Sequence, residues 1–136
     1  MIRGYRTGLQ LLATLTFGLG AMTAVPGETG GEEQRFPDVL SAEITPRGEN
    51  RFDFDVTISS PYDTPARYAD GFRVSGLDGE RYGERKLLHD HAEEQPFTRD
   101  LYGVEIPAGV RRVVIQARDQ RYGYGGKSIE VDLPGR

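Results

Sequence analysis

The most regular pattern in the chain is an alternation of apolar and polar residues over positions 51–59. The stretch RFDFDVTIS places large apolar side chains at every second position, namely Phe52, Phe54, Val56 and Ile58. Because successive side chains of a strand point to opposite faces, this period of two predicts a β-strand with one buried face. Asp53 and Asp55 then lie on the solvated face, and the alternation favours that role over a cation or acid/base site.

Similar stretches recur about every ten residues and are separated by glycine and proline. The other expected strands cover residues 39–44, 67–74, 81–88, 97–106, 110–117 and 128–133. About seven short strands with this punctuation predict an all-β sandwich. The residues expected in its core are Phe52, Phe54, Val56, Ile58, Phe72, Val74, Ile115, Ile129 and Val131.

The segment VEIPAGV at 104–110 adds a resemblance to this pattern. It resembles the later strands of fibronectin type III and immunoglobulin-like domains, in which a Pro-Ala-Gly type of turn precedes a core strand. The resemblance implies an immunoglobulin-like or fibronectin type III-like sandwich, and we expect it to occupy residues 37–136 as one domain.

Residues 84–95 fit this scheme less well. The sequence ERKLLHDHAEEQ consists largely of good helix formers and stops at Pro96. A short helix inserted between two strands therefore competes with a strand or loop over this segment.

The N-terminus predicts export. Arg3 and Arg6 precede an apolar run from Leu9 to about Ala24, which is the pattern of a secretory signal peptide over residues 1–24. The run is short and contains glycine, so we expect cleavage and no stable membrane insertion afterwards. Residues 25–36 are rich in Gly and Glu and predict a flexible acidic leader. We expect a periplasmic or secreted protein.

Composition narrows the chemistry further. The chain has 136 residues, 17 Lys plus Arg, 21 Asp plus Glu, a formal net charge of −4 and no cysteine. The absence of cysteine excludes disulfides, thiolate metal sites and a thiol nucleophile within these residues. The acidic balance argues against nucleic acid as a partner, because binding phosphates requires a basic face.

The two histidines form the only metal-like pattern. His89 and His91 stand two residues apart, with Glu93 and Glu94 close behind. On a strand, positions i and i+2 share a face, so both imidazoles could approach one Cu²⁺ or Zn²⁺ ion while a glutamate completes the set. On a helix the two rings diverge. Histidines in an acidic loop are more often structural or surface groups, so no cofactor is expected and copper or zinc is the alternative.

Two further segments carry candidate binding residues. HDHAEEQPFTR, at 89–99, resembles a stretch of small uncharacterised exported bacterial proteins, a likeness that implies no activity, and it contains Arg99. RYGYGGK, at 121–127, predicts a hairpin tip whose Tyr122 and Tyr124 could stack on a ligand or fold back onto the core.

No catalytic motif occurs in the chain, so no catalytic residue is assigned and the protein is not expected to be an enzyme. Rigid strands that carry variable loops are typical of binding domains. We therefore predict an exported, non-enzymatic interaction module that binds an unknown protein or small-molecule ligand through loops at one end of the sandwich. The alternative is a small periplasmic metal-binding or redox-accessory protein that uses the His-Asp-His segment.

Overall fold

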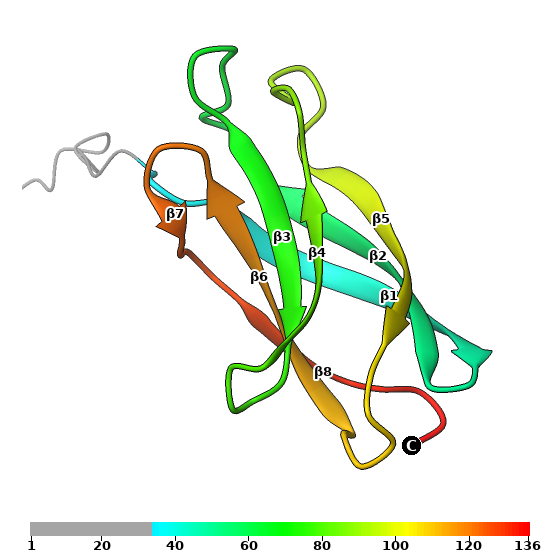
Figure 1. Cartoon of the computed structure of the whole chain (residues 1–136). Coiled ribbons are helices and arrows are strands. Elements are labelled where there is room, and N and C mark those ends of the chain that lie inside the picture. The colour runs from blue at the N-terminus through cyan, green and yellow to red at the C-terminus, as the bar shows by residue number, and fades with distance from the viewer. Residues whose placement is uncertain (1–33) are drawn as a thin grey trace, which may run out of the picture. The chain divides into compact units, whose positions relative to one another are not determined.

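A computed structural model describes residues 34–136, so the predicted signal peptide and most of the predicted leader lie outside the described residues. The described part forms eight strands: β1 (Asp38–Gly48), β2 (Arg51–Ser59), β3 (Ala69–Ser75), β4 (Arg81–Lys86), β5 (Phe97–Glu105), β6 (Arg112–Asp119), β7 (Gly123–Tyr124) and β8 (Ile129–Asp132). One sheet has the order β1-β2-β5. The other has the order β4-β3-β6-β7, and β8 also pairs with β6 (Figure 1). All pairs are antiparallel, which confirms the predicted all-β sandwich.

The apolar faces of the two sheets meet in one core. Seven of the nine predicted core residues are buried, from Phe52 on β2 to Ile115 on β6, while Ile129 and Val131 on β8 are half-buried and pack against the others. The core also includes residues that the alternation did not single out, namely Val39, Ala69, Leu87, Phe97, Val104, Ile106, Val113, Ala117 and Leu133. Asp55 and Thr57 face outward on β2 between buried neighbours, as the alternation predicts. Asp53, which was expected on the same solvated face, is only 9% exposed and accepts from the N–H of Gly103 (2.9 Å) and from Nε of Arg47 (2.6 Å).

The helix considered for residues 84–95 does not form. Residues 84–86 belong to β4, which pairs with β3. The two backbones approach closely at Gly71, where an added Cβ would lie 2.7 Å from the carbonyl oxygen of Arg85. Residues 87–96 then form a loop in which Leu87 and His91 are buried. Sheet pairing and burial override the local helix propensity here, because propensity differs by less than about 1 kcal/mol per ordinary residue.

The β1–β2 connection is shorter than the six residues, 45–50, that lie between the expected strands 39–44 and 51–59. Strand β1 continues to Gly48, and only Glu49 and Asn50 connect it to β2, both with positive φ (53° and 63°). A two-residue hairpin turn with positive φ at both positions matches the twist of the flanking strands.

The loops divide between the two ends of the sandwich (Figure 1). One end, which we call the loop end, carries the β2–β3 loop (60–68), the β4–β5 loop (87–96) and the β6–β7 loop (120–122). The opposite end carries the β1–β2, β3–β4 and β5–β6 connections and the last residues, 133–136. No helix within residues 34–136 is long and apolar enough to cross a bilayer.

Candidate functional site

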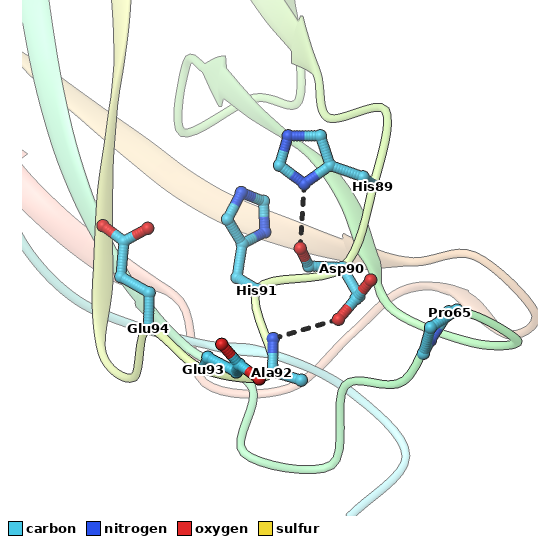
Figure 2. Close-up of a pocket in the computed structure, with 7 residues that line it drawn as sticks. All are labelled: Pro65, His89, Asp90, His91, Ala92, Glu93 and Glu94. Atoms are coloured by element: carbon cyan, nitrogen blue, oxygen red, sulfur yellow. Dashed lines mark hydrogen bonds between the residues drawn. The ribbon is translucent and has the colours of Figure 1, made fainter.

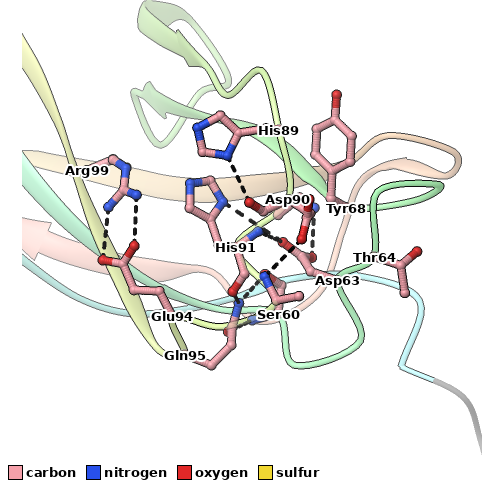
Figure 3. A network of polar contacts seen from close by, with 12 residues as sticks. Ser60, Asp63, Thr64, Tyr68, His89, Asp90, His91, Glu94, Gln95 and Arg99 are labelled. Carbon is pink, nitrogen blue, oxygen red and sulfur yellow. Dashed lines mark hydrogen bonds and ion pairs between the residues drawn. The ribbon is translucent and has the colours of Figure 1, made fainter.

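The loop end is held together by a buried carboxylate that the sequence did not reveal. Asp63, in the β2–β3 loop, is 4% exposed. One of its oxygens accepts a hydrogen bond from the backbone N–H of Ala69 (3.0 Å), and the other accepts one from the N–H of His91 (3.1 Å). Because a buried carboxylate requires such partners, Asp63 fixes the β4–β5 loop against the β2–β3 loop (Figure 3).

A second set of bonds closes the base of the β4–β5 loop. The side-chain carbonyl of Gln95 accepts from the N–H of Ser60 (2.7 Å), and its amide nitrogen donates to the carbonyl of His91 (3.0 Å). Asp90 accepts from the N–H of Ala92 (3.2 Å) within the same loop. The loop is therefore ordered by side-chain contacts to the backbone, which replace the helical bonds expected from its composition.

The two histidines meet at this loop but differ in environment. Their ring centroids lie 4.9 Å apart (Figure 2). His91 has a side chain only 3% exposed and stacks on Phe97, with ring centroids 4.0 Å apart. His89 lies at the surface, and its Nδ1 is 2.8 Å from the carbonyl oxygen of Asp90. One imidazole is thus part of the core and the other faces solvent.

Burial controls the protonation of His91. Its Nδ1 lies 4.0 Å from the carboxylate of Asp63 and has no hydrogen-bond partner. Burial, with the nearby Arg99 and His89, lowers the pKa of His91, and the opposing effects of Asp63 and Glu94 do not restore it. The ring is therefore neutral at pH 7.

Stability is expected to fall as the pH is lowered from above about 6.5, the ordinary pKa of histidine, towards the depressed pKa of His91. The unfolded chain takes up a proton in this window and the native protein resists it, so acid favours unfolding. Urea denaturation at several pH values would measure the slope. His91→Phe keeps an aromatic ring stacked on Phe97 but removes the titrating group, so this variant is expected to lose the pH dependence of stability that is due to His91. His89→Gln is expected to retain it. An equal slope in wild type and His91→Phe would contradict this assignment.

A pocket of about 430 Å³ opens beside the histidines. It is lined by Pro65, His89, Asp90, His91, Ala92, Glu93 and Glu94 (Figure 2). Three of these residues are acidic, but Glu94 forms a two-point ion pair with Arg99 (3.3 and 3.0 Å), and Arg99 lowers the pKa of Glu94. Arg99, predicted as a binding residue, therefore orients the rim of this pocket.

The structure brings only part of the predicted metal set together. His89 and His91 are neighbours, whereas Glu94 is engaged with Arg99. Within residues 34–136, no group of three His, Cys, Asp or Glu side chains is arranged to hold a metal ion.

The two predicted tyrosines lie in different surroundings. Tyr122 is 45% exposed and lies beside Phe36, with ring centroids 6.2 Å apart. Tyr124, on β7, packs under the guanidinium of Arg73 at 3.8 Å, and its hydroxyl is buried. Burial raises the pKa of Tyr124. The two rings thus serve separate contacts, and Arg99 pairs with Glu94 at the rim of the pocket.

Behind Tyr122 lies a buried ion pair between Arg67 and Asp119 (3.3 Å). Asp119 is fully buried and also accepts from the hydroxyl of Tyr62 (2.6 Å) and from the N–H of Arg121 and Tyr122 (2.8 and 2.9 Å). Burial raises the pKa of Asp119, but the hydrogen bonds from Tyr62, the two backbone N–H groups and Arg67 outweigh it and the net shift is downward. This carboxylate joins the β2–β3 and β6–β7 loops.

The guanidinium of Arg67 also fixes the segment that precedes β1. It donates to the carbonyls of Gln34 (3.1 Å) and Arg35 (2.8 Å) and lies between the rings of Tyr62 and Tyr122, at 4.3 and 4.9 Å from their centroids. Residues 34–36, which the sequence places in the leader, therefore contact the loop end. No motif distinguishes Arg67 or Asp119 in the sequence, because the contacts of Arg67 with residues 34 and 35, and of Asp119 with Arg67 and Tyr62, join residues 32 to 57 positions apart.

Comparison with known proteins identifies few relatives, and no protein-family model matches the chain. The chain is similar to a protein of Halomicrobium mukohataei named "Putative lipoprotein", with 36% identity over 115 residues. The match covers 85% of this chain and 56% of that protein, so the chain spans about half the length of the curated relative it matches. Among solved structures it is similar to a DUF3823 family protein from Bacteroides ovatus, with a TM-score of 0.44 and 18% identity over 72% of this chain and 56% of that one.

Proposed function

We propose that this chain is an exported, non-enzymatic interaction module whose binding surface is the loop end. The observation that carries the proposal is the pair of buried carboxylates, Asp63 and Asp119, which fix the β2–β3 loop to the β4–β5 loop and to the β6–β7 loop. The β2–β3 and β4–β5 loops line an open pocket. Loops fixed in this way lose little conformational entropy when a partner binds, which favours affinity.

We also infer that the sandwich belongs to the immunoglobulin-like class, which carries binding loops at its ends. In support, β1, β2 and β5 form one sheet while β3, β6 and β8 are neighbours in the other. This order agrees with the immunoglobulin arrangement, except that β4 pairs with β3, as an added strand does in variable-type domains.

An exported location in the cell envelope agrees with two observations. The first 24 residues read as a secretory signal peptide. The relative from Halomicrobium mukohataei is named "Putative lipoprotein", and we propose an exported, cell-envelope location for this chain as well.

The loop end also presents apolar surface to solvent. Leu88 is 82% exposed. Two hydrogen bonds hold the backbone around it: the N–H of Leu87 donates to the carbonyl of Asp70 (2.9 Å), and the hydroxyl of Tyr68 donates to the carbonyl of Leu88 (3.4 Å). A large apolar side chain held outward on an ordered loop beside a pocket is suited to insertion into a partner protein.

Site-specific photocrosslinking tests this proposal. A photoreactive phenylalanine analogue at Leu88 is expected to give a discrete crosslinked product in the native host. The matched control is the same analogue at Tyr102, which is 59% exposed on β5 away from the loop end, and it is expected to give none. The product from position 88 is also expected to disappear with Glu93→Lys, which reverses charge in the pocket. Equal products from both positions, or a product insensitive to Glu93→Lys, would overturn the proposal.

Metal binding is a second candidate, favoured by one observation, the 4.9 Å separation of the two imidazoles. Equilibrium dialysis with Cu²⁺, Ni²⁺ and Zn²⁺ against wild type and His89→Ala separates the two functions. Loss of binding in His89→Ala and retention in Leu88→Ala would support a metal site. Equal binding by all three proteins would exclude it.

A further inference from the structure

At the end of the sandwich opposite the loop end, four oxygen atoms converge on the guanidinium of Arg136. Its Nη1 donates to the backbone carbonyls of Pro107 (2.5 Å) and Val110 (2.8 Å). Its Nη2 donates to the carbonyl of Ile106 and to the side-chain oxygen of Asn50, both at 2.8 Å. We call these four oxygens the carbonyl cradle. They accept from both terminal nitrogens of the planar group, which is the arrangement that a guanidinium requires.

An aromatic ring completes the cradle. The guanidinium carbon of Arg136 lies 4.9 Å from the ring centroid of Phe52, whose side chain is otherwise in the core. A cation over an aromatic face gains about 0.5–2 kcal/mol, and a guanidinium stacks on such a face better than an ammonium does.

The cradle is formed by bonds that do not involve Arg136. The N–H of Val110 donates to the carbonyl of Pro107 (3.0 Å), and the N–H of Ile106 donates to the backbone carbonyl of Asn50 (2.9 Å). The first bond closes the β5–β6 turn and the second ties that turn to the β1–β2 hairpin. The acceptors therefore keep their positions when the arginine leaves, so the site is preorganised.

The segment that carries Arg136 is held less firmly. Leu133 is buried, and its N–H donates to the carbonyl of Arg111 (2.8 Å). Beyond it, Gly135 has a φ of 84°, which turns the chain back, and the hydrogen bonds found for residues 134–136 are those of the Arg136 side chain. Segments with few backbone hydrogen bonds open locally at little cost in free energy.

An open pocket of about 390 Å³ adjoins the cradle and shares three of its residues. The pocket is lined by Asn50, Glu80, Arg81, Tyr82, Glu105, Ile106 and Pro107. The charged residues of this lining are Glu80, Glu105 and Arg81, and Arg81 is paired with Glu84 (2.9 Å), so the surroundings of the cradle also favour a cationic ligand.

We propose that the carbonyl cradle is a guanidinium-binding site that Arg136 occupies within the chain, and that an arginine side chain of another polypeptide replaces it when residues 134–136 swing away. Lysine is a poor ligand for this site, because its three N–H donors leave one nitrogen in a tetrahedral arrangement, whereas the four oxygens are placed around two nitrogens of a planar guanidinium. The surface is separate from the loop end, so this inference does not depend on the function proposed there.

Binding of a small arginine probe to Arg136→Ala tests the site. Titration with N-acetyl-arginine methylamide, followed by ¹H–¹⁵N spectra, is expected to give saturable shifts confined to residues 50–52 and 106–110. The affinity of wild type for the probe is expected to be lower by a factor of about ten or more, because its own arginine competes at high effective concentration. N-acetyl-lysine methylamide is expected to be a similarly poor ligand for Arg136→Ala.

Thermal unfolding provides a second readout. The arginine probe is expected to raise the Tm of Arg136→Ala by more than that of wild type at the same concentration, since stabilisation grows with the ratio of free ligand to Kd. Asn50→Ala in the Arg136→Ala background removes one acceptor and is expected to weaken binding. If Arg136→Ala does not fold, Arg136→Lys serves in its place, because the lysine keeps the charge and leaves the cradle unfilled. Equal binding of the arginine and lysine probes, equal binding by wild type and variant, or no saturable shift would overturn the proposal.

Discussion

Replacement of Phe54 by alanine is expected to lower the free energy of unfolding by about 3–5 kcal/mol. Phe54 is fully buried on β2, in the centre of the sheet β1-β2-β5, and pairs with Ile44 on one side and Leu101 on the other. Truncation removes the apolar ring from the core and leaves a cavity between the sheets, because a close-packed interior relaxes only partly.

Chemical denaturation with urea measures this loss as a lower midpoint at an unchanged slope. Asp55→Ala is the matched control, since Asp55 is the next residue on the same strand and faces outward. It lies across from Glu43 and Asp100, so its removal also relieves repulsion between like charges, and the expected change is small. Equal effects of the two substitutions would mean that the face assignment of β2 is wrong.

Replacement of Asp119 by alanine is expected to cost a similar amount, about 3–5 kcal/mol, for a different reason. The substitution removes the buried carboxylate that pairs with the guanidinium of Arg67, whose side chain is 10% exposed. It also leaves the N–H groups of Arg121 and Tyr122 and the hydroxyl of Tyr62 without their acceptor. Buried donors that lose an acceptor keep their full desolvation cost.

The matched control is Asp132→Ala. Asp132 also forms an ion pair with an arginine, Arg112, but its side chain is 83% exposed. Exposed pairs of this kind contribute about 0–1 kcal/mol, so the midpoint of denaturation is expected to change little. An Asp119→Ala protein as stable as Asp132→Ala would show that the buried pair contributes nothing to the loop end.

The positions of most strands could be predicted from the sequence, because they depend on local patterns of apolar and polar residues. The period of two in RFDFDVTIS predicted β2 with its bounds and its buried face, and weaker patterns predicted six more strands to within a few residues. Glycine and proline predicted most of the connections. Residues 84–95 were ambiguous because their helix-forming composition conflicts with pairing to β3, a contact that no local pattern reveals.

The sites depended on contacts that only the tertiary structure creates. His89, His91, Glu93 and Glu94 attracted attention as neighbours in sequence, yet the structure buries one imidazole and pairs Glu94 with Arg99. No local pattern singled out Asp63 or Asp119.

The sequence by itself determined most of the strands and the face that each of them buries, since both follow from the order of apolar and polar residues over short stretches of chain. It also predicts an export signal, which lies outside the described residues. The tertiary structure decided which loops meet. The partners that organise the two ends are 28 residues apart for Asp63 and His91, 57 for Tyr62 and Asp119, and 86 for Asn50 and Arg136. Such pairs come together only when the two sheets stack. The stacking is driven by burial of apolar surface, which is non-directional, so the local sequence does not show which polar residues it brings together.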